Sequence, residues 1–457
     1  MKSFLPVGVA RRRAPSPVAA VDRAGRQMLE LRRAADPDSP LVSVVLPCLN
    51  EAGSVGTVVR EALAALRDAG LDGEVVVADN GSTDASAEIA EAAGARVVSA
   101  PVRGYGNAYH AGMAAARGQV LVMADADGTY PMQAIPELAC PVLYGTSDMV
   151  IGSRLMGTIA KKAMPWKHRY IGNPILTRLL NRFFHITVSD AHSGMRAIDA
   201  HAYASLGLRT PGMEYASEMI VQAARAKLRV GELPIPYHPR VGESKLQTWP
   251  DGWRHLKFLL LASPTWLYLI PGILAFVLGL AVVIPMTFGP VHIGPINLVL
   301  HPMLVGAVLT IIGWQMIQLG VLVRVCLPLP AGVTDRLSDF VNRRLTIERT
   351  LLGGAGVLGI GVLAGAAIAI KWATEGFGPL QEVRPGITAL VFCVLGAQTI
   401  FAAFLYAFFL PAYFGGDVAP GRIERDDQFL ARPVVLTGRR AAAATAASVA
   451  ENTRSRS

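Results

Sequence analysis

The chain has 457 residues, of which 52% are hydrophobic and only 17% are charged. Soluble chains are about 25% charged on average, so this composition excludes a purely soluble protein and a disordered one. The net charge of +9 in so apolar a chain points to anionic lipid and lipid phosphate as partners. Nucleic acid is not expected as a partner. The cysteines are spaced too widely for a disulfide scaffold or a zinc module. They are Cys48, Cys140, Cys326 and Cys393.

Residues 1–40 are rich in arginine and contain no apolar run of the kind that marks a signal peptide. We expect a basic, flexible arm in water. Docking of a basic helix near 21–34 on a membrane surface is the alternative.

From Val42 onward, short apolar runs alternate with helical patterns. Strands are predicted at 42–48, 74–78, 96–99 and 120–124, with helices near 54–69, after 83 and near 105–117. This alternation predicts an α/β fold, an open sheet with crossover helices, over residues 41–247. Ligands of such sheets bind beyond the carboxyl ends of the strands.

Four long apolar segments follow the α/β region, and each exceeds the ~20 residues needed to cross a bilayer. They lie at about 265–287, 298–323, 350–371 and 388–412, within a transmembrane region of residues 264–413. They predict two transmembrane hairpins, which can self-associate, so a homo-oligomer is one expectation. Residues 248–263 carry Trp249, Trp253 and Lys257 and predict an amphipathic helix lying in the membrane interface.

Positive charge in the connecting loops predicts the orientation. Arginines are frequent in 324–349 and in the tail 414–457, whereas 288–297 has no Lys or Arg. By the positive-inside rule the α/β domain, the middle loop and the tail are cytoplasmic. The sequence therefore predicts a multi-pass protein of the inner (plasma) membrane.

Acidic residues gather where the predicted strands end. Strand 42–48 is followed by Asn50 and Glu51, strand 74–78 by Asp79, and strand 120–124 by Asp125 and Asp127. A lone Asp-x-Asp is usually an exposed turn, but three acidic clusters at consecutive strand ends are hard to reach by chance. Asp125 and Asp127 can both face one Mg²⁺ or Mn²⁺, which would clamp a diphosphate leaving group.

These motifs, taken in order, resemble family 2 glycosyltransferases. The match is closer to the dolichyl-phosphate mannose synthase group and the bacterial membrane-anchored polyprenyl-phosphate glycosyltransferases. It covers about residues 42–262 and implies the GT-A fold. The matching pieces are Pro47 with Asn50-Glu51, Asp79-Asn80-Gly81-Ser82, Gly104-Tyr105-Gly106, Asp125-Ala126-Asp127-Gly128, Gly152-Ser153-Arg154, Ser193-Gly194-Met195-Arg196 and Arg240 to Leu246.

The resemblance implies a role for each matching residue. The nucleoside of the donor would be contacted by Pro47, Glu51 and Asp79, and Asn50 and Asn80 would also belong to the donor site. Many members have an Asp at the position of Asn80, so the identity of the nucleotide stays open. The metal and the diphosphate would be held by Asp125 and Asp127, under a loop carrying Arg240, Ser244 and Lys245. The acceptor phosphate would be gripped by Arg154 and Arg169, with Asn173 beside them; Asp127, Arg154 and Arg169 are the expected catalytic residues.

The chemistry of the residues agrees, because arginine offers the forked donors and the positive charge that a phosphate needs. Glu214 and Glu218 lie four residues apart on a predicted helix and can share a face. Either is a candidate general base, and a structural pair is the alternative. A phosphate acceptor, with a second pKa of about 6, is already an oxyanion at neutral pH and needs no strong base.

The expected reaction is transfer of one sugar from a nucleoside-diphosphate sugar of the UDP-glucose or GDP-mannose type to a polyprenyl phosphate at the cytoplasmic face. The resemblance implies that this transfer inverts the configuration at the sugar. Three alternatives remain. One is transfer to a hydroxyl on a lipid or glycan. Another is a processive polysaccharide synthase, which is disfavoured because Ala226 follows Gln222-Ala223-Ala224-Arg225 where such enzymes carry a Trp. The last is a non-catalytic lipid-phosphate scaffold, disfavoured by the Asp125 and Asp127 pair.

Overall fold

The computed structural model describes residues 30, 32, 38–242, 248–293, 296–326, 340, 346–379 and 382–409. The chain divides into two compact units after Leu256. We call the described residues up to Leu256 the sheet unit and those from Lys257 the helical unit. The tail 414–457, most of the arm 1–40, and the predicted donor residues Ser244 and Lys245 lie outside the described residues.

The sheet unit is built on a seven-stranded mixed sheet in the order β3-β2-β1-β4-β6-β5-β7. The four strands expected from apolar runs are confirmed, because strands buried on both faces read as continuous hydrophobic segments. One strand, β6, runs antiparallel to both of its neighbours, β4 and β5. The strands are β1 (Val42–Cys48), β2 (Gly73–Asp79), β3 (Arg96–Ser99), β4 (Val120–Met123), β5 (Met149–Ser153), β6 (Arg196–Asp199) and β7 (Val230–Pro234).

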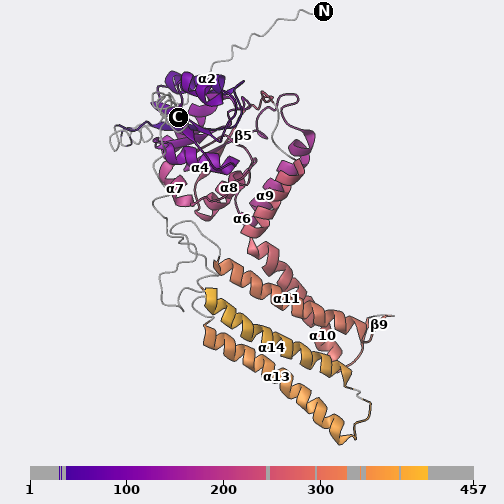
Figure 1. Cartoon of the computed structure of the whole chain (residues 1–457). Helices are drawn as coiled ribbons and strands as arrows, with labels where there is room; N and C mark the ends of the chain where they lie inside the picture. Colours follow the sequence, from indigo (N-terminus) through magenta and orange to yellow (C-terminus); the bar gives the residue numbers. More distant parts are fainter. Residues whose placement is uncertain are drawn as a thin grey trace, which may run out of the picture. The chain divides into compact units, whose positions relative to one another are not determined.

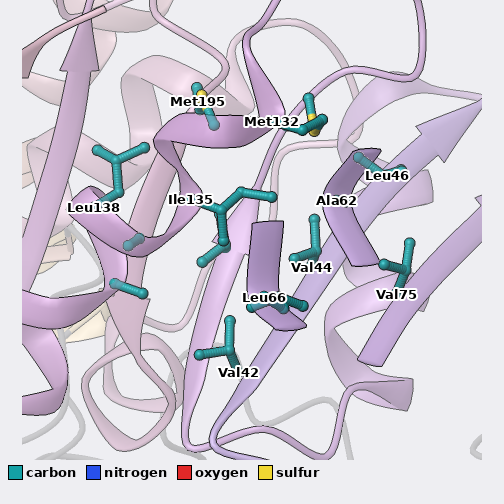
Figure 2. Close-up of a cluster of buried hydrophobic side chains, with 14 of the residues drawn as sticks. Val42, Val44, Leu46, Ala62, Leu66, Val75, Met132, Ile135, Leu138 and Met195 are labelled. Atoms are coloured by element: carbon teal, nitrogen blue, oxygen red, sulfur yellow. The ribbon is translucent and has the colours of Figure 1, made fainter. Parts of the chain in front are cut away.

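Helices cover both faces of this sheet and give an α/β/α arrangement, the GT-A architecture that the resemblance implies. Alternate residues of β1, such as Val44 and Leu46, point into a core that includes Leu66 and Ile135 (Figure 2). Gly112 packs on Val45, on the opposite face. The helices are α2 (Val55–Asp68), α3 (Ser86–Ala92) and α5 (Ile135–Leu143) on the first face, α4 (Tyr105–Ala115) and α8 (Tyr215–Arg225) on the second, and α6 (Asn173–Phe184) and α7 (Ala200–Leu206) beside α8.

Arg32, in the predicted flexible arm, is docked on the sheet unit. Arg32 Nη2 donates to Asp199 Oδ2 at 2.7 Å, and the Arg32 carbonyl accepts from Gln119 Nε2 at 2.9 Å. Both partners lie at the ends of sheet strands far along the chain, so no local pattern could indicate the contact. The expected free arm therefore does not extend to Arg32.

The helical unit contains four helices that are long and apolar enough to cross a membrane, as expected. They are Thr265–Phe288, made of η3 (Thr265–Leu269) and α10 (Ile270–Phe288), then α11 (His301–Cys326), α13 (Ile347–Thr374) and α14 (Val383–Phe409) (Figure 1). The short strands β8 (Val291–Ile293) and β9 (Ile296–Leu298) connect α10 to α11. The helix α9 (Thr248–Ala262) occupies the segment expected at the membrane interface; its location there stays a prediction.

The four helices pair as two hairpins, α10 with α11 and α13 with α14. Their backbones approach closely at glycines: a Cβ atom on Gly313 would lie 2.4 Å from the Phe276 nitrogen, and one on Gly396 would lie 2.3 Å from the Leu358 nitrogen. Small residues allow such contacts between membrane helices. A hydrogen bond of 3.0 Å from Trp314 Nε1 to Thr399 Oγ1 joins α11 to α14, so the hairpins form one bundle.

Candidate active site

The register of the sheet brings the predicted site residues Asp125 and Arg154 to one of its edges. Met123 of β4 and Ile151 of β5 both pair with Arg196 of β6. Asp125 and Arg154 follow these two strands directly and therefore emerge at the same edge. Since β6 runs in the opposite direction, the residues that precede it reach this edge as well.

Asp125 and Asp127 are held by neighbouring hydroxyl and backbone groups. Asp125 Oδ1 accepts from the Tyr105 hydroxyl at 3.0 Å, and Asp127 Oδ1 accepts from the nitrogen and hydroxyl of Thr129 at 3.0 and 2.7 Å. Burial, and then the charge of Asp127, raise the pKa of Asp125 above its ordinary value. A divalent cation between the two carboxylates would relieve this repulsion.

The oxygen ligands at this position fit Mg²⁺ or Mn²⁺, which bind one or two carboxylates together with substrate phosphates. Within the described part of the chain, no group of three or more His, Cys, Asp and Glu side chains is suited to hold a metal ion. An ion on Asp125 and Asp127 would therefore need further oxygens from a ligand such as a diphosphate.

Arg240 joins two of the predicted donor-binding acids. Its Nη1 lies 3.2 Å from Asp127 Oδ2, and its Nη2 pairs with the Glu51 carboxylate. The Val241 nitrogen donates to the Asp127 carbonyl at 3.1 Å, which holds this segment against the turn after β4. The buried Nε of Arg240 has no hydrogen-bond partner among the described residues. The structure thus brings together Glu51, Asp127 and Arg240, which are far apart in sequence.

The residues expected at the nucleoside tie together the loops after β1 and β2. Asn50 Oδ1 accepts from the Thr83 nitrogen at 2.8 Å, and Asp79 Oδ1 accepts from the Ser82 nitrogen at 3.2 Å. Pro47 lies within β1 and is half-buried. These contacts fix the shape of the loops, while the roles of Pro47, Asn50 and Asp79 in donor binding stay predictions.

Asn80 has a structural role that the sequence did not indicate. Its Nδ2 donates to the carbonyls of Ala100 and Val102, both at 2.8 Å, and its Oδ1 accepts from the Gly104 nitrogen at 2.8 Å. An ionised Asp has no hydrogen to donate and could not make the first two bonds. These two bonds thus depend on the amide at position 80, and donor contact by Asn80 stays a prediction.

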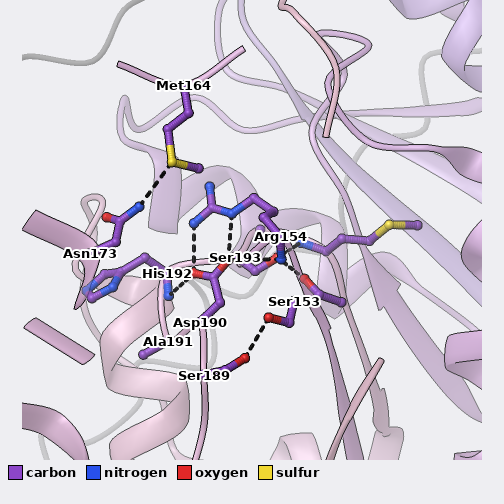
Figure 3. A network of polar contacts seen from close by, with 12 residues as sticks. Ser153, Arg154, Met164, Asn173, Ser189, Asp190, Ala191, His192 and Ser193 are labelled. Carbon is purple, nitrogen blue, oxygen red and sulfur yellow. Dashed lines mark hydrogen bonds and ion pairs between the residues drawn. The ribbon is translucent and has the colours of Figure 1, made fainter. Parts of the chain in front are cut away.

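Arg154, at the end of β5, is buried and bound to Asp190. Its Nε and Nη2 donate to the two Asp190 oxygens at 2.8 and 2.9 Å, and its backbone nitrogen donates at 3.1 Å (Figure 3). Burial alone would favour the neutral acid, but the Arg154 charge holds the pKa of Asp190 below its usual range. The guanidinium also lies over the Tyr237 ring, 5.2 Å from its centre. Nη1 is the part of the fork that Asp190 does not engage.

Arg169 and Asn173 lie at the start of α6. Arg169 belongs to the turn η2 (His168–Gly172), and its guanidinium is 5.2 Å from the centre of the Tyr170 ring. It forms no ion pair with any acidic side chain that the structure describes. Asn173 Nδ2 donates to Met164 Sδ at 3.7 Å (Figure 3). Contact of Arg169 with the acceptor stays a prediction.

Glu218 of α8 and Glu214, the residue just before this helix, have different surroundings. The Glu218 carboxylate accepts from the nitrogens of Arg209 and Thr210 and from the Thr210 hydroxyl, the last at 2.7 Å. These bonds fix the turn before α8, as a structural residue would. Glu214 Oε2 is buried and has no hydrogen-bond partner in the described part of the chain. A catalytic role for either glutamate stays a prediction.

Tyr105 and Asp190 bond to predicted site residues, and His192 adjoins Asp190, although the sequence predicted no part in the site for these three. Asp190 and His192 lie just before the motif Ser193-Gly194-Met195-Arg196, which was their only signal. The buried Arg196 shapes this loop by donating to the carbonyls of Ala191, Ser193 and Ala216, at 2.8, 2.8 and 2.7 Å.

Gly194 leaves room for Asp125, which gives a testable prediction. A Cβ atom at position 194 would lie 3.0 Å from Asp125 Oδ2 and 3.2 Å from the Tyr130 hydroxyl. We expect Gly194→Ala to fold but to bind nucleotide sugar about tenfold more weakly in the presence of Mn²⁺, since overpacking costs about 1–3 kcal/mol. Calorimetry measures the affinity, and Gly252→Ala, where a Cβ meets nothing within 4 Å, is the control. Unchanged affinity in Gly194→Ala would remove Asp125 from the donor site.

Two family models match this chain. Residues 43–207 match glycosyl transferase family 2, and residues 330–410 match the C-terminal transmembrane region of family 2 glycosyltransferases. Among solved structures, glucosyl-3-phosphoglycerate synthase of Mycobacterium tuberculosis, in complex with Mn²⁺ and UDP-glucose, matches with 25% identity and a TM-score of 0.42. That match covers 55% of this chain and 84% of the other.

The relatives from Haloferax volcanii include a dolichyl-phosphate hexose transferase and the hexosyltransferase Agl6. The dolichyl-phosphate hexose transferase is 33% identical over 212 residues, which cover 46% of this chain and 89% of that protein. The low-salt glycan biosynthesis hexosyltransferase Agl6 is 39% identical over 377 residues, which cover 82% of this chain and 91% of the relative. On the strength of this last match, the chain belongs to glycosyltransferase family 2, as a membrane member with a GT-A domain and four apolar helices.

Proposed function

We propose that this glycosyltransferase transfers one hexose from a nucleoside-diphosphate sugar to a polyprenyl phosphate at the cytoplasmic face of the inner (plasma) membrane. The observation that carries the proposal is the meeting of two sets of groups at one sheet edge: the carboxylates Asp125 and Asp127, and the cation Arg154. The first set suits a metal-bound diphosphate, and the Nη1 group of Arg154, which Asp190 does not engage, suits a second phosphate. The relative named dolichyl-phosphate hexose transferase supports this acceptor class.

On the donor side, Asp125 and Asp127 would hold Mg²⁺ or Mn²⁺. When bound, such an ion neutralises the charge of the departing diphosphate. Arg240 adds a cation beside Asp127, and its unpaired Nε is a further donor for a phosphate oxygen. Exchange of its carboxylate partners for the diphosphate would draw the segment 238–242 over the donor.

On the acceptor side, the phosphate oxyanion is itself the nucleophile. Arg169 and the Nη1 group of Arg154 would orient it, and Asn173 would add a donor. Attack on the anomeric carbon opposite the departing diphosphate forms the new carbon–oxygen bond and inverts the configuration. Positioning and charge neutralisation then supply the rate enhancement, without a strong base.

A hydroxyl acceptor is the second candidate, favoured by the unpaired Oε2 of Glu214. To distinguish a phosphate acceptor from a hydroxyl acceptor, release of nucleoside diphosphate from UDP-glucose and GDP-mannose is measured with and without polyprenyl phosphate. The mass of the lipid product is determined by mass spectrometry. The proposal predicts stimulation by the lipid and a product heavier by one hexose. Release that the lipid does not change, with no glycolipid formed, contradicts it. A ladder of hexoses would indicate a processive synthase.

The role of Arg169 is tested by Arg169→Lys, which keeps the charge but loses the forked geometry. We expect acceptor turnover to fall about ten- to a hundredfold, since a charge-assisted hydrogen bond contributes about 1.5–3 kcal/mol. Donor affinity should change little. Acceptor kinetics and donor calorimetry are run on the same protein, with Arg178→Lys on the exposed face of α6 as the control. Equal losses would assign Arg169 to the donor, and no loss would make it a surface residue.

A further inference from the structure

The loop of residues 189–193, just before β6, is fixed by hydrogen bonds on both sides of His192. The Ser189 nitrogen donates to the Glu232 carboxylate at 2.8 Å, and Ser193 Oγ donates to the Gly152 carbonyl at 2.5 Å. Arg196 Nη2 donates to the Ala191 carbonyl at 2.8 Å. The backbone at His192 therefore has little freedom, and the position of its side chain is set by the fold.

The imidazole of His192 has both of its nitrogens buried, and neither has a hydrogen-bond partner among the described residues. Its backbone nitrogen donates to Asp190 Oδ1 at 3.3 Å, so the residue adjoins the Arg154–Asp190 pair (Figure 3). Leaving a buried polar group unpaired costs about 1–3 kcal/mol, and native proteins have few such groups. An unpaired imidazole in a rigid loop is thus expected to gain a partner from a ligand.

The neighbouring ring of His255, on α9, is held in place and packs on His192. The two rings meet edge to face with centres 4.7 Å apart, and His255 Nδ1 is bonded to the Ser217 hydroxyl at 2.8 Å. The contact between the rings is therefore one of packing and gives the His192 nitrogens no partner. A substitution that keeps a ring at position 192 can preserve it.

The charges around His192 favour its neutral form. Burial, and then His255, hold the pKa of His192 well below its ordinary value. The charged groups that act on it are Asp190 in its own loop, Arg154 at the end of β5 and Arg196 in β6. A neutral imidazole has one N–H to donate. Because Asp190 balances the charge of Arg154, a phosphate arriving here would need such additional donors.

We propose that His192 is an acceptor-binding residue, whose imidazole N–H donates to an oxygen of the lipid phosphate that does not attack the sugar. The inference rests on the proposed function, because it assumes that the acceptor carries a phosphate. His192 would add a neutral hydrogen-bond donor to the charged donors Arg154 and Arg169, and it lies in the loop before β6.

The test is His192→Phe, which keeps a ring against His255 and removes both nitrogens. With farnesyl phosphate as the acceptor, we expect KM for the acceptor to rise about tenfold while donor affinity stays within about twofold. His192→Gln, which retains an N–H donor, should recover a large part of the loss. The control His255→Phe keeps the ring contact and loses the bond to Ser217, so its KM for the acceptor should match the wild type.

A direct readout uses full-length protein with ¹⁵N-labelled histidine in detergent. The ring signal that disappears in His192→Phe should shift in the wild type when farnesyl phosphate is added, and not when farnesol is added. The inference is overturned if the ring signal does not change on addition of farnesyl phosphate, or if KM for the acceptor is unchanged in His192→Phe. It is also overturned if KM rises equally in His192→Phe and His255→Phe. If the wild type transfers no hexose to farnesyl phosphate or to longer polyprenyl phosphates, the proposed function itself fails. Transfer with a normal KM in His192→Phe would remove only the role of His192.

Discussion

Replacing Asp127 with Asn is expected to lower turnover at least about a hundredfold while the fold is retained. The change removes one of two anionic ligands from the candidate metal position, and it also removes the charge that faces Arg240. Each loss of about 1.4 kcal/mol in transition-state stabilisation is tenfold in rate, and charge-assisted contacts contribute about 1.5–3 kcal/mol each. The fold should survive because the Asn carbonyl can still accept the two Thr129 bonds at this turn.

The measurement is the initial rate of hexose transfer at increasing Mg²⁺ and Mn²⁺ concentrations, beside a thermal unfolding curve. Asp72→Asn, a change of the same chemistry at an exposed residue, is the matched control and should behave as the wild type. Chelation of divalent ions should abolish wild-type turnover. Full activity of Asp127→Asn at ordinary magnesium concentrations would refute the metal assignment.

Asp190→Ala is expected to lower the stability of the sheet unit by about 3–5 kcal/mol. The substitution leaves the Arg154 guanidinium buried without its counter-charge, and breaking a buried ion pair from one side has a cost of this size. Asp190 is fully buried, and Arg154 is only 7% exposed, so water can replace the lost partner poorly. A double variant, Arg154→Met with Asp190→Leu, should recover most of the stability but not acceptor turnover.

The chain provides a matched comparison in the ion pair of Asp148 with Arg229. There too, Nε, Nη2 and the backbone nitrogen of the arginine all donate to one aspartate, but the arginine side chain is 58% exposed. Asp148→Ala should therefore destabilise far less, because exposed pairs contribute little. Hydrogen exchange of the β5 and β6 amides in the full chain reports the stability of the sheet unit. Equal loss of protection in both variants would contradict the argument from burial.

The sequence was sufficient to predict the parallel strands and the polar residues that follow their carboxyl ends. Parallel strands appear in the sequence as apolar runs, and their carboxyl ends lie at one edge of the sheet. Asp79, Asp125 and Asp127 were therefore predicted at the same edge, where the parallel pairing of β2, β1 and β4 places them. The positions of Asp190 and His192 were not predicted, because β6 runs antiparallel to its neighbours. The residues that reach this edge from β6 therefore precede the strand instead of following it. The direction of β6 depends on its pairing with β4 and β5, which local pattern does not encode.

Side-chain partners were the least predictable part of the site. The i, i+4 spacing of Glu214 and Glu218 places both on one helix face, yet the turn at Arg209 and Thr210 engages only Glu218. Likewise, Arg240 meets Glu51 across 189 positions of sequence. Such contacts depend on how the loops pack after the sheet has formed. The arginine at position 154 could therefore suggest phosphate binding, but the sequence did not indicate that Asp190 binds it.

The last strand of the sheet, β7, ends at Pro234, whereas the first apolar helix begins at Thr265. During synthesis, all seven strands therefore leave the ribosome before the first of the four apolar helices that the structure describes. Domains generally fold as units, with the amino-terminal one first. A nascent chain can thus complete the sheet, including insertion of β6 between β4 and β5, while it is still in water. The sheet unit would then already be folded when the chain reaches the membrane. If insertion of the apolar helices is delayed, these helices are the part of the chain exposed to aggregation.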